Sequence, residues 1–273
     1  METTYDSIQP GMVAILGIPS DENSSFLRGP AQAPAAIRQT LYSGSSNWCT
    51  EDGLDLEAEP RLVDEGDLKL SPGETGTQIE SAVARLLQHG ARVLSLGGDH
   101  AVTYPILKAY GKQFQDLSIL HIDAHPDLYD ELDGNRCSHA CPFARIMEAG
   151  LAKRLVQVGI RTLNPHQRRQ ASRFGVEMVE MRAWPPAAPL EFNGPTYLSL
   201  DLDALDPAYA PGVSHHAPGG FTTREVLNLI QGLRAPLVGA DIVELNPVRD
   251  LAGITAAAAV KFLKEIAARL LDL

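Results

Sequence analysis

Short segments that are apolar almost without interruption alternate along this chain with longer amphipathic segments. The apolar segments are residues 12–18, 92–96, 117–122, 155–159, 176–180, 196–202 and 236–242. A strand that is buried on both faces is apolar throughout, whereas a strand with one solvent-exposed face alternates polar and apolar residues. The amphipathic segments, which we expect to be helices, are residues 34–42, 77–89, 102–110, 142–148, 223–233 and 255–271. The alternation predicts an α/β fold of three α/β/α layers, with a central parallel sheet between helices.

Local signals refine this organisation. Thr222 followed by Glu225 is typical of a capping box at the start of a helix. Residues 43–72 have no clear period and many acidic, Gly and Pro residues, so we expect a long surface excursion there. Residues 184–195 are rich in proline and are expected to form another loop. A chain of 273 residues is normal for one α/β domain, so we expect residues 1–273 to form a single domain.

The formal net charge of −11 argues against a nucleic-acid partner, because phosphate binding needs a basic face and the sequence shows no stripe of Lys and Arg. The acidity mildly favours a cationic substrate through steering, although solubility alone accounts for it. No apolar run is long enough to span a bilayer, and residues 1–11 lack the basic residues of a targeting peptide. The cysteines Cys49, Cys137 and Cys141 form no CxxC pair and suit a reducing cytoplasm.

Acidic residues and histidines follow four of the predicted strands, at the point where each strand ends. His100 closes a Gly-Gly-Asp-His run after residues 92–96, and Glu244 follows residues 236–242. The two other strands are followed by a denser set, Asp123, His125 and Asp127 after one, and Asp201 and Asp203 at the end of the other. Ligands bind at the carboxyl ends of the strands in open α/β sheets, so we expect these side chains at one edge.

The spacing of this set indicates a metal site. Residues at i, i+2 and i+4 of an extended segment point the same way. Bare carboxylates packed so closely would repel one another and raise each other's pKa. Two divalent cations would neutralise the four aspartates, and a pair of metals that share carboxylates can hold a bridging hydroxide. A single metal could not use all these ligands and keep a position open for substrate.

The segments around these residues resemble the ureohydrolases, the family of arginases, agmatinases and their relatives. The matching segments are GGDH (97–100), DAHPD (123–127), SLDLDALDPAYAPG (199–212) and VELNP (243–247). The resemblance covers almost the whole chain and is closest to plant-type arginases; it includes NSSFLRGPAQAP (23–34), GNRCSHACPFARIMEAG (134–150), VQVGIR (156–161) and GVSH (212–215). It implies the arginase/deacetylase fold and a homo-oligomer, either a trimer or a hexamer.

The resemblance also implies two manganese ions per chain. The ligands it implies are His100 with Asp127 for one metal, His125 with Asp203 for the other, and Asp123 and Asp201 as bridges. A set of mostly carboxylate oxygens with some imidazole suits Mn²⁺, without excluding Ni²⁺, Co²⁺ or Zn²⁺. Two metals can lower the pKa of bound water to about 7, and the hydroxide would attack the guanidinium carbon and release urea.

Three residues are implied in catalysis. Asp127 is placed to accept the proton of the bridging hydroxide. Glu244 would pair with the guanidinium in bidentate fashion and orient it. His139 matches the shuttle histidine of the family and would deliver a proton to the departing amine. His215 is expected to line the pocket near the guanidinium, whereas His121 is expected to be an ordinary buried histidine.

Substrate choice is less constrained. Asn135 and Ser138 are neutral donors that could meet the carboxylate of arginine, but a loop turn and a cap explain them equally well. Asn164 stands where animal arginases have an aspartate that binds the α-amino group, and Ala217 replaces a glutamate of the plant pattern. We expect hydrolysis of arginine to ornithine and urea, with agmatine or a guanidino acid as the alternative substrate.

Two hypotheses from other classes compete with this one. A deacetylase on the same fold needs one zinc and would not require both His100 and every aspartate of the set. A non-catalytic binding protein derived from the fold should have lost ligands, and this sequence has lost none. Release of urea would separate these hypotheses.

Overall fold

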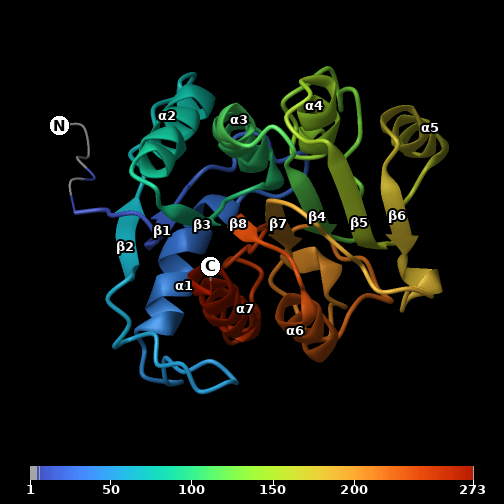
Figure 1. Ribbon diagram of the computed structural model, residues 1–273. Coiled ribbons are helices and arrows are strands. Elements are labelled where there is room, and N and C mark those ends of the chain that lie inside the picture. The colour runs from blue at the N-terminus through green and yellow to red at the C-terminus, as the bar shows by residue number, and fades with distance from the viewer. Residues whose placement is uncertain (1–4, 6, 273) are drawn as a thin grey trace.

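The computed structural model describes residue 5 and residues 7–272, and its described strands form one eight-stranded parallel sheet between two helical layers (Figure 1). The strands are β1 (Val13–Gly17), β2 (Leu62–Asp67), β3 (Arg92–Leu96), β4 (Ser118–Ile122), β5 (Arg154–Ile160), β6 (Glu177–Glu180), β7 (Thr196–Asp201) and β8 (Leu237–Val243). Their order across the sheet is β2-β1-β3-β8-β7-β4-β5-β6. The predicted three-layer α/β/α architecture is therefore confirmed.

The helices divide between the two faces of the sheet. Their bounds are α1 (Ala33–Leu41), α2 (Thr75–Gln88), α3 (Thr103–Gln113), α4 (Pro142–Glu148), α5 (Pro165–Phe174), α6 (Thr223–Gly232) and α7 (Ile254–Leu271). Helices α2 to α5 cover one face, and α1, α6 and α7 cover the other (Figure 1). The capping box at the start of α6 is confirmed: Thr222 accepts from the backbone N–H of Glu225, whose carboxylate accepts from the N–H of Thr222. Within the described part of the chain, no helix combines the length and apolar character that crossing a membrane would require.

Two elements of the structure were not predicted from the sequence. Strand β2 lies inside the stretch 43–72, so the prediction of an unbroken surface excursion there is wrong. Its sequence LVDEGD shows no apolar run, because β2 is a partly exposed edge strand that, among the described strands, pairs only with β1. Helix α5 has no apolar stripe either, since its buried residues are Gln167 and Gln170. The sequence signals for this helix are at its two ends. Asn164 is the N-cap, Pro165 is the first helical residue, and Gly175 ends the helix in the left-handed conformation.

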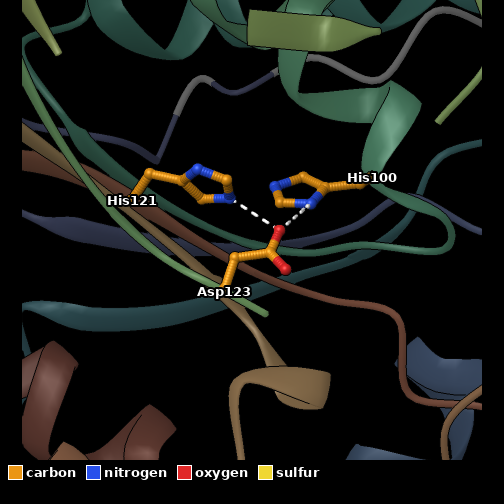
Figure 2. Close-up of side chains that lie close together, drawn as sticks. All are labelled: His100, His121 and Asp123. Carbon is orange, nitrogen blue, oxygen red and sulfur yellow. Dashed lines mark hydrogen bonds and ion pairs between the residues drawn. The ribbon is translucent and has the colours of Figure 1, made fainter. Parts of the chain in front are cut away.

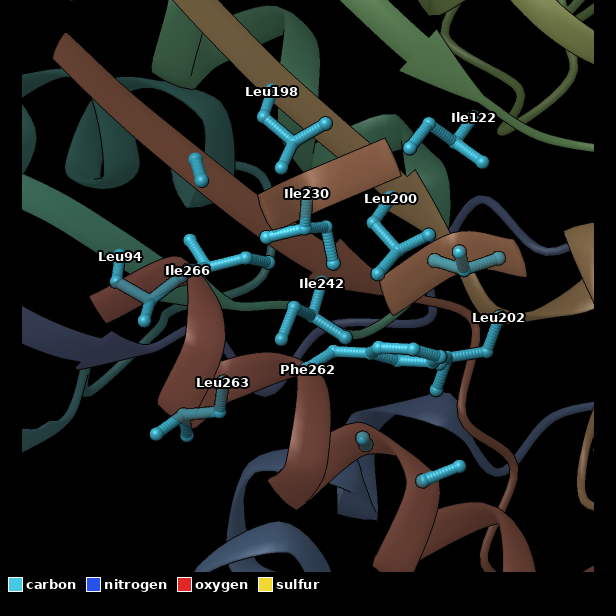
Figure 3. Close-up of a cluster of buried hydrophobic side chains, with 14 of the residues drawn as sticks. Leu94, Ile122, Leu198, Leu200, Leu202, Ile230, Ile242, Phe262, Leu263 and Ile266 are labelled. Carbon is cyan, nitrogen blue, oxygen red and sulfur yellow. The ribbon is translucent and has the colours of Figure 1, made fainter. Parts of the chain in front are cut away.

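The core is packed on both faces of the sheet. On one face, side chains from the central strands meet the long helix α7; Figure 3 shows Leu94, Leu198 and Ile242 against this layer. Helix α7 presents Phe262, Leu263 and Ile266 to the sheet, and all three are fully buried. Burying a side chain of this size stabilises the fold by about 1.5–3 kcal/mol. This layer fixes the position of the central strands and of the loops that follow them.

The order of the strands brings the polar residues at their ends together. The neighbouring strands β3, β8, β7 and β4 lie at the centre of the sheet, and they are the four strands that are followed by the acidic and histidine residues. All strands of the sheet are parallel, so their carboxyl ends lie along one edge. The candidate site is therefore at the carboxyl edge of the four central strands.

Candidate metal centre

His100 enters the site from a tight turn after β3. Gly98 allows this turn, because a Cβ there would lie 1.7 Å from the backbone oxygen of Ser20. The turn is closed by Asp99, whose carboxylate accepts from the backbone N–H of Ala101 and caps the short 3₁₀ helix that begins at His100. The backbone N–H of His100 then donates to Oε1 of Glu244 (2.9 Å), which ties the turn after β3 to the end of β8.

The ring of His100 is oriented by a buried hydrogen-bond chain. Its Nε2 lies 2.9 Å from Oγ of Ser199, and that hydroxyl donates to Oδ1 of Asp241 at 2.7 Å. The carboxylate of Asp241 also accepts from Thr103 and Tyr197. Since the Ser199 proton is directed to Asp241, the Ser199 oxygen accepts from the Nε2–H of His100. The lone pair of His100 is therefore on Nδ1. Asp241 was not identified from the sequence as part of the site. The signal available there was a single aspartate within an otherwise apolar strand.

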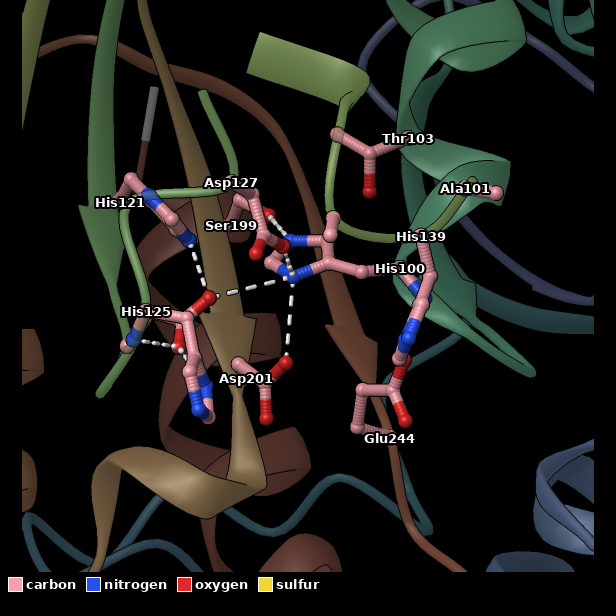
Figure 4. Close-up of polar contacts among 12 residues, drawn as sticks. His100, Ala101, Thr103, His121, His125, Asp127, His139, Ser199, Asp201 and Glu244 are labelled. Atoms are coloured by element: carbon pink, nitrogen blue, oxygen red, sulfur yellow. Dashed lines mark hydrogen bonds and ion pairs between the residues drawn. The ribbon is translucent and has the colours of Figure 1, made fainter. Parts of the chain in front are cut away.

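Nδ1 of His100 faces three carboxylate oxygens at nearly equal distances. Oδ2 of Asp123 lies at 3.3 Å, and Oδ2 of Asp127 and of Asp201 each lie at 3.1 Å (Figure 4). Among the described residues, this fully buried nitrogen has no hydrogen-bond partner. Burial alone would lower the pKa of His100, but its contacts with these three carboxylates raise it well above its usual range in the metal-free protein. Positive charge is favoured at this position, and a nitrogen with three surrounding oxygens fits a divalent metal ion.

A second group of ligands adjoins the first. Nδ1 of His125 lies 3.0 Å from Oδ2 of Asp203 and 3.4 Å from Oδ1 of Asp123. One ligand atom from each of these three residues lies within 4.8 Å of the others. Asp123 thus offers one oxygen to each group. Burial, followed by the neighbouring Asp123, raises the pKa of Asp203 to about 6, although His125 lowers it. A carboxylate shared between two histidines fits a pair of cations better than a single one.

His121 orients the carboxylate of Asp123 through a hydrogen bond. Its Nε2 lies 2.7 Å from Oδ2 of Asp123, and Figure 2 shows this ring and that of His100 on either side of the carboxylate. Nδ1 of His121 lies 2.9 Å from Nε2 of Gln157, which also donates to the backbone oxygen of Pro126. Nδ1 therefore accepts, and Nε2–H donates to Asp123. His121 has the ligand atoms to join a metal group, but both of its nitrogens are hydrogen-bonded, as expected of a buried histidine that orients a ligand.

Two residues of the site have left-handed backbone conformations. Asp127 has φ of 48° and Glu244 has φ of 65°. Such values cost a non-glycine residue free energy and occur where the surrounding structure enforces them, often at functional sites. Both residues line the cavity of the candidate site.

Glu244, His139 and Ser25 form a hydrogen-bonded row. Nδ1 of His139 lies 2.8 Å from Oε1 of Glu244, and its Nε2 lies 2.8 Å from Oγ of Ser25. Burial would lower the pKa of His139, but Glu244 raises it to about 9. Burial would likewise raise the pKa of Glu244, but His139 lowers it. The pair is therefore an imidazolium and a carboxylate near neutral pH. Ser25 was not identified from the sequence, because no local pattern links it to His139.

These residues line a cavity of about 200 Å³. Its wall is formed by Ser25, His125, Asp127, Tyr129, Leu132, His139, Ala140, Asp201, Asp203, His215 and Glu244. The ring of His215 lies between those of His139 and His125, with centroid distances of 5.2 and 6.0 Å. The sequence analysis placed His215 near the guanidinium, and the structure puts it on this cavity. His216 points elsewhere and contacts the backbone oxygen of Pro211.

Tyr129 lines the cavity and was not identified from the sequence as part of the site. Its hydroxyl accepts a 2.5 Å hydrogen bond from Nδ2 of Asn164, so its own O–H is directed elsewhere. Asn164 uses its other polar atom, Oδ1, to cap α5 by accepting from the backbone N–H of Gln167. Asn164 therefore fixes Tyr129 and the start of α5, whereas Tyr129 is the residue of the two that lines the cavity.

Asn135 and Ser138 do not line this cavity. Oδ1 of Asn135 accepts from the backbone N–H of Cys137, and Nδ2 donates to Oδ1 of Asn23. Ser138 is buried and lines a neighbouring cavity of about 290 Å³. Its backbone oxygen accepts from the N–H of Cys141. Both residues take part in the loop turn that was the equally weighted alternative, and their contact with a substrate carboxylate stays a prediction.

Arg161 connects two loops next to the candidate ligands through hydrogen bonds. Its guanidinium donates to the backbone oxygens of Asp203, Ala204, Leu205 and Ala217. These bonds link the segment that carries Asp203 to the segment that follows His215. The role depends on contacts between distant segments, and no sequence pattern predicted it.

Comparisons with known proteins agree with one another. The family model described as the arginase family matches residues 12–268. Arginase 1, mitochondrial, of Arabidopsis thaliana is 44% identical over 94% of this chain and 80% of its own length. The solved arginase from Medicago truncatula superposes with a TM-score of 0.90 at 40% identity, covering 96% of this chain and 88% of the other. An agmatinase of Bacillus anthracis is 33% identical over 96% of this chain and 93% of its own length.

Proposed function

The chain belongs to the arginase family, and from this premise we propose that it hydrolyses the guanidinium group of arginine to yield ornithine and urea. The observation that carries the proposal is the environment of Nδ1 of His100, a buried nitrogen surrounded by three carboxylate oxygens. A deacetylase-like site for one metal would leave the second group, His125 with Asp203, without a purpose.

We propose that two cations, manganese by preference, are held by the two adjacent groups. His100 and Asp127 would bind one cation and His125 and Asp203 the other, with Asp123 and Asp201 between them. Nearly all of these groups are buried, and their ordinary charges would be unstable together without cations. When bound, a pair of divalent cations supplies water that is acidic enough to give hydroxide near neutral pH.

The protein side chains would orient the substrate and handle its protons. Both hydrogen-bond contacts of Glu244 use Oε1, from the N–H of His100 and from His139, so Oε2 is the oxygen we expect to meet the guanidinium. The bidentate pairing inferred from the sequence would need His139 to release Oε1. His139, charged near neutral pH, is placed to donate a proton to the departing amine. Asp127 would accept the proton of the attacking water.

Two observations favour arginine over agmatine. Tyr129 lines the cavity and its hydroxyl proton is not used by Asn164, so we propose that it donates to a substrate carboxylate, which agmatine lacks. The plant relatives named arginase are also more similar to this chain than the agmatinase, at 44% against 33% identity. Agmatine and a guanidino acid are the alternative substrates.

The test is a comparison of kcat/KM for arginine, agmatine and 4-guanidinobutyrate with Mn²⁺-loaded protein. We expect urea from arginine at a kcat/KM at least tenfold above that for the other two substrates, a margin that corresponds to about 1.4 kcal/mol of transition-state binding. A higher value for agmatine would replace arginase activity with agmatinase activity. Absence of urea from every substrate would refute the ureohydrolase assignment.

The remaining inferences from the sequence are part of the proposal. We propose that residues 1–273 act as one domain, because both helical layers pack on the same sheet. The free cysteines support a reducing, cytoplasmic location, although several plant relatives are named mitochondrial or chloroplastic. We also propose a homo-oligomer, with no nucleic-acid or membrane partner.

A further inference from the structure

Asp99 is a fully buried carboxylate next to the candidate site, outside the implied ligand set. Its Oδ2 accepts from the backbone N–H of Asn23 at 3.0 Å and from Oγ of Ser24 at 3.1 Å. Its Oδ1 accepts from the backbone N–H of Ala101 at 3.2 Å. Within the described part of the chain, Asp99 forms no ion pair, and these three hydrogen bonds stabilise its charge against burial. A buried carboxylate with this arrangement strongly constrains the groups that donate to it.

The segment that Asp99 holds is the one that contacts His139. The backbone oxygen of Asn23 accepts from the N–H of His139 at 3.1 Å, and Oγ of Ser25 lies 2.8 Å from Nε2 of the same residue. The segment therefore contacts His139 through both its backbone and its ring. Ser25 is exposed and follows directly after the two residues that donate to Asp99.

The turn that carries Asp99 is fixed independently of this segment's side chains. Its backbone N–H donates to Ser20, and Gly98 leaves no space between the turn and Ser20. The turn also carries His100, whose N–H donates to Glu244. Asp99 thus joins a fixed turn of the site to the loop that contacts His139.

We propose that Asp99 is a positioning residue for the reaction, holding Asn23 and Ser24 so that the hydroxyl of Ser25 stays on Nε2 of His139. The inference rests on the proposed function, in which His139 donates a proton. In this arrangement Ser25 fixes the ring from one side and Glu244 from the other, so that the ring cannot rotate away from the departing amine. Asp99 acts through Ser25 and does not contact the substrate.

The kinetic test compares Asp99→Asn, Ser25→Ala and the double variant. An amide at position 99 keeps one acceptor oxygen and presents an NH₂ group to donors that now use both carboxylate oxygens, so the hold on Asn23 and Ser24 is weakened. We expect Asp99→Asn to lower kcat by about 10- to 100-fold, the range for misplacement of a catalytic group, with KM and metal content changed little. Because both changes remove the same contact with His139, the double variant should match the slower single variant. Multiplied losses would overturn the proposal.

Asp250→Asn is the matched control. Asp250 also accepts two backbone N–H bonds, from Thr255 and Ala256, but it serves the start of α7. This variant should keep kcat within about twofold of the parent, as expected for independent sites. An equal loss in both variants would mean that Asp99→Asn acts through general stability, which contradicts the proposal.

A second measurement does not depend on activity. Hydrogen–deuterium exchange of the peptides covering residues 20–28 and 135–141 should be faster in Asp99→Asn than in the parent and in Asp250→Asn. Unchanged exchange in these peptides would overturn the proposal whether or not the protein releases urea. If the parent releases no urea from any guanidino substrate, the proposed function fails, while the exchange result still decides whether Asp99 holds the segment.

Discussion

Nδ1 of His139 lies 2.8 Å from Oε1 of Glu244, although the two residues are 105 positions apart in the chain. From the sequence, the two residues are expected to have separate roles, His139 in proton transfer and Glu244 in binding the guanidinium. In the structure they are an ion pair, since Glu244 raises the pKa of His139 to about 9. A guanidinium bound at Glu244, as we propose, would compete with His139 for the same carboxylate. Binding of the substrate and release of the proposed proton donor would therefore be coupled.

The first prediction concerns Glu244→Gln. The amide keeps the size of the side chain but removes the charge that both His139 and the guanidinium require. We expect kcat/KM to fall by about 10²–10³-fold, mainly through a higher KM, because a charge-assisted pair is lost in ground state and transition state alike. Steady-state urea release at matched Mn²⁺ measures this. An unchanged KM would contradict the proposed contact with the guanidinium.

The second prediction concerns His139→Asn. If His139 donates the proton, kcat should fall by about 10²–10⁴-fold, the usual range for general acid–base catalysis. KM and metal content should stay close to those of the parent, because His139 is not among the implied ligands. Added imidazole should restore part of the rate. If His139 only anchors its loop, KM should rise, kcat should be largely kept and imidazole should have no effect.

The third prediction concerns metal content. Protein expressed with Mn²⁺ should contain about two ions per chain, the number that the two ligand groups can hold. Asp127→Asn or His125→Asn should lower metal content and abolish nearly all urea release while the far-UV circular dichroism spectrum stays the same. The core lies below these residues and does not depend on them. Full activity with one tightly bound zinc would refute the two-metal proposal.

The fourth prediction concerns the pH dependence of metal binding. Burial opposes the charged forms of His100 and His125, but the surrounding carboxylates raise both pKa values well above the usual range. Both rings are therefore protonated at neutral pH in the metal-free protein, and cations must displace these protons. Affinity for Mn²⁺ should weaken as pH falls, by about tenfold per pH unit for each proton displaced. Calorimetry of the metal-free protein in buffers of different ionisation enthalpy counts the protons, and pH-independent affinity would contradict this.

The fifth prediction concerns Tyr129→Phe. Loss of a hydrogen bond to a charged group costs about 1.5–3 kcal/mol, so kcat/KM for arginine should fall by about 10- to 100-fold. The value for agmatine should change little, since agmatine has no carboxylate to receive the bond. An equal loss for both substrates would show that Tyr129 supports the cavity wall without distinguishing between them.

The sequence by itself determined the layers of the fold and the implied metal ligands. Strands buried on both faces must be apolar throughout, so β3, β4 and β7 could be located from their composition. The ligands follow such strands directly, at the alternate positions of an extended chain, as Asp123 and His125 do. These features are local in the chain, and local spacing is what a sequence displays.

The tertiary structure decided what depends on contacts between distant segments. Edge strand β2 and the polar helix α5 could not be predicted from the sequence, because neither has an apolar pattern. Their positions are fixed by the elements that neighbour them in the fold. The contacts of Ser25 with His139 and of Asn164 with Tyr129 join residues from different loops. Asn135 has the chemistry of a substrate contact, but in the structure its amide is used by Cys137 and Asn23. Hydrogen bonding depends on distance and direction in space, and for these pairs only the folded chain sets both.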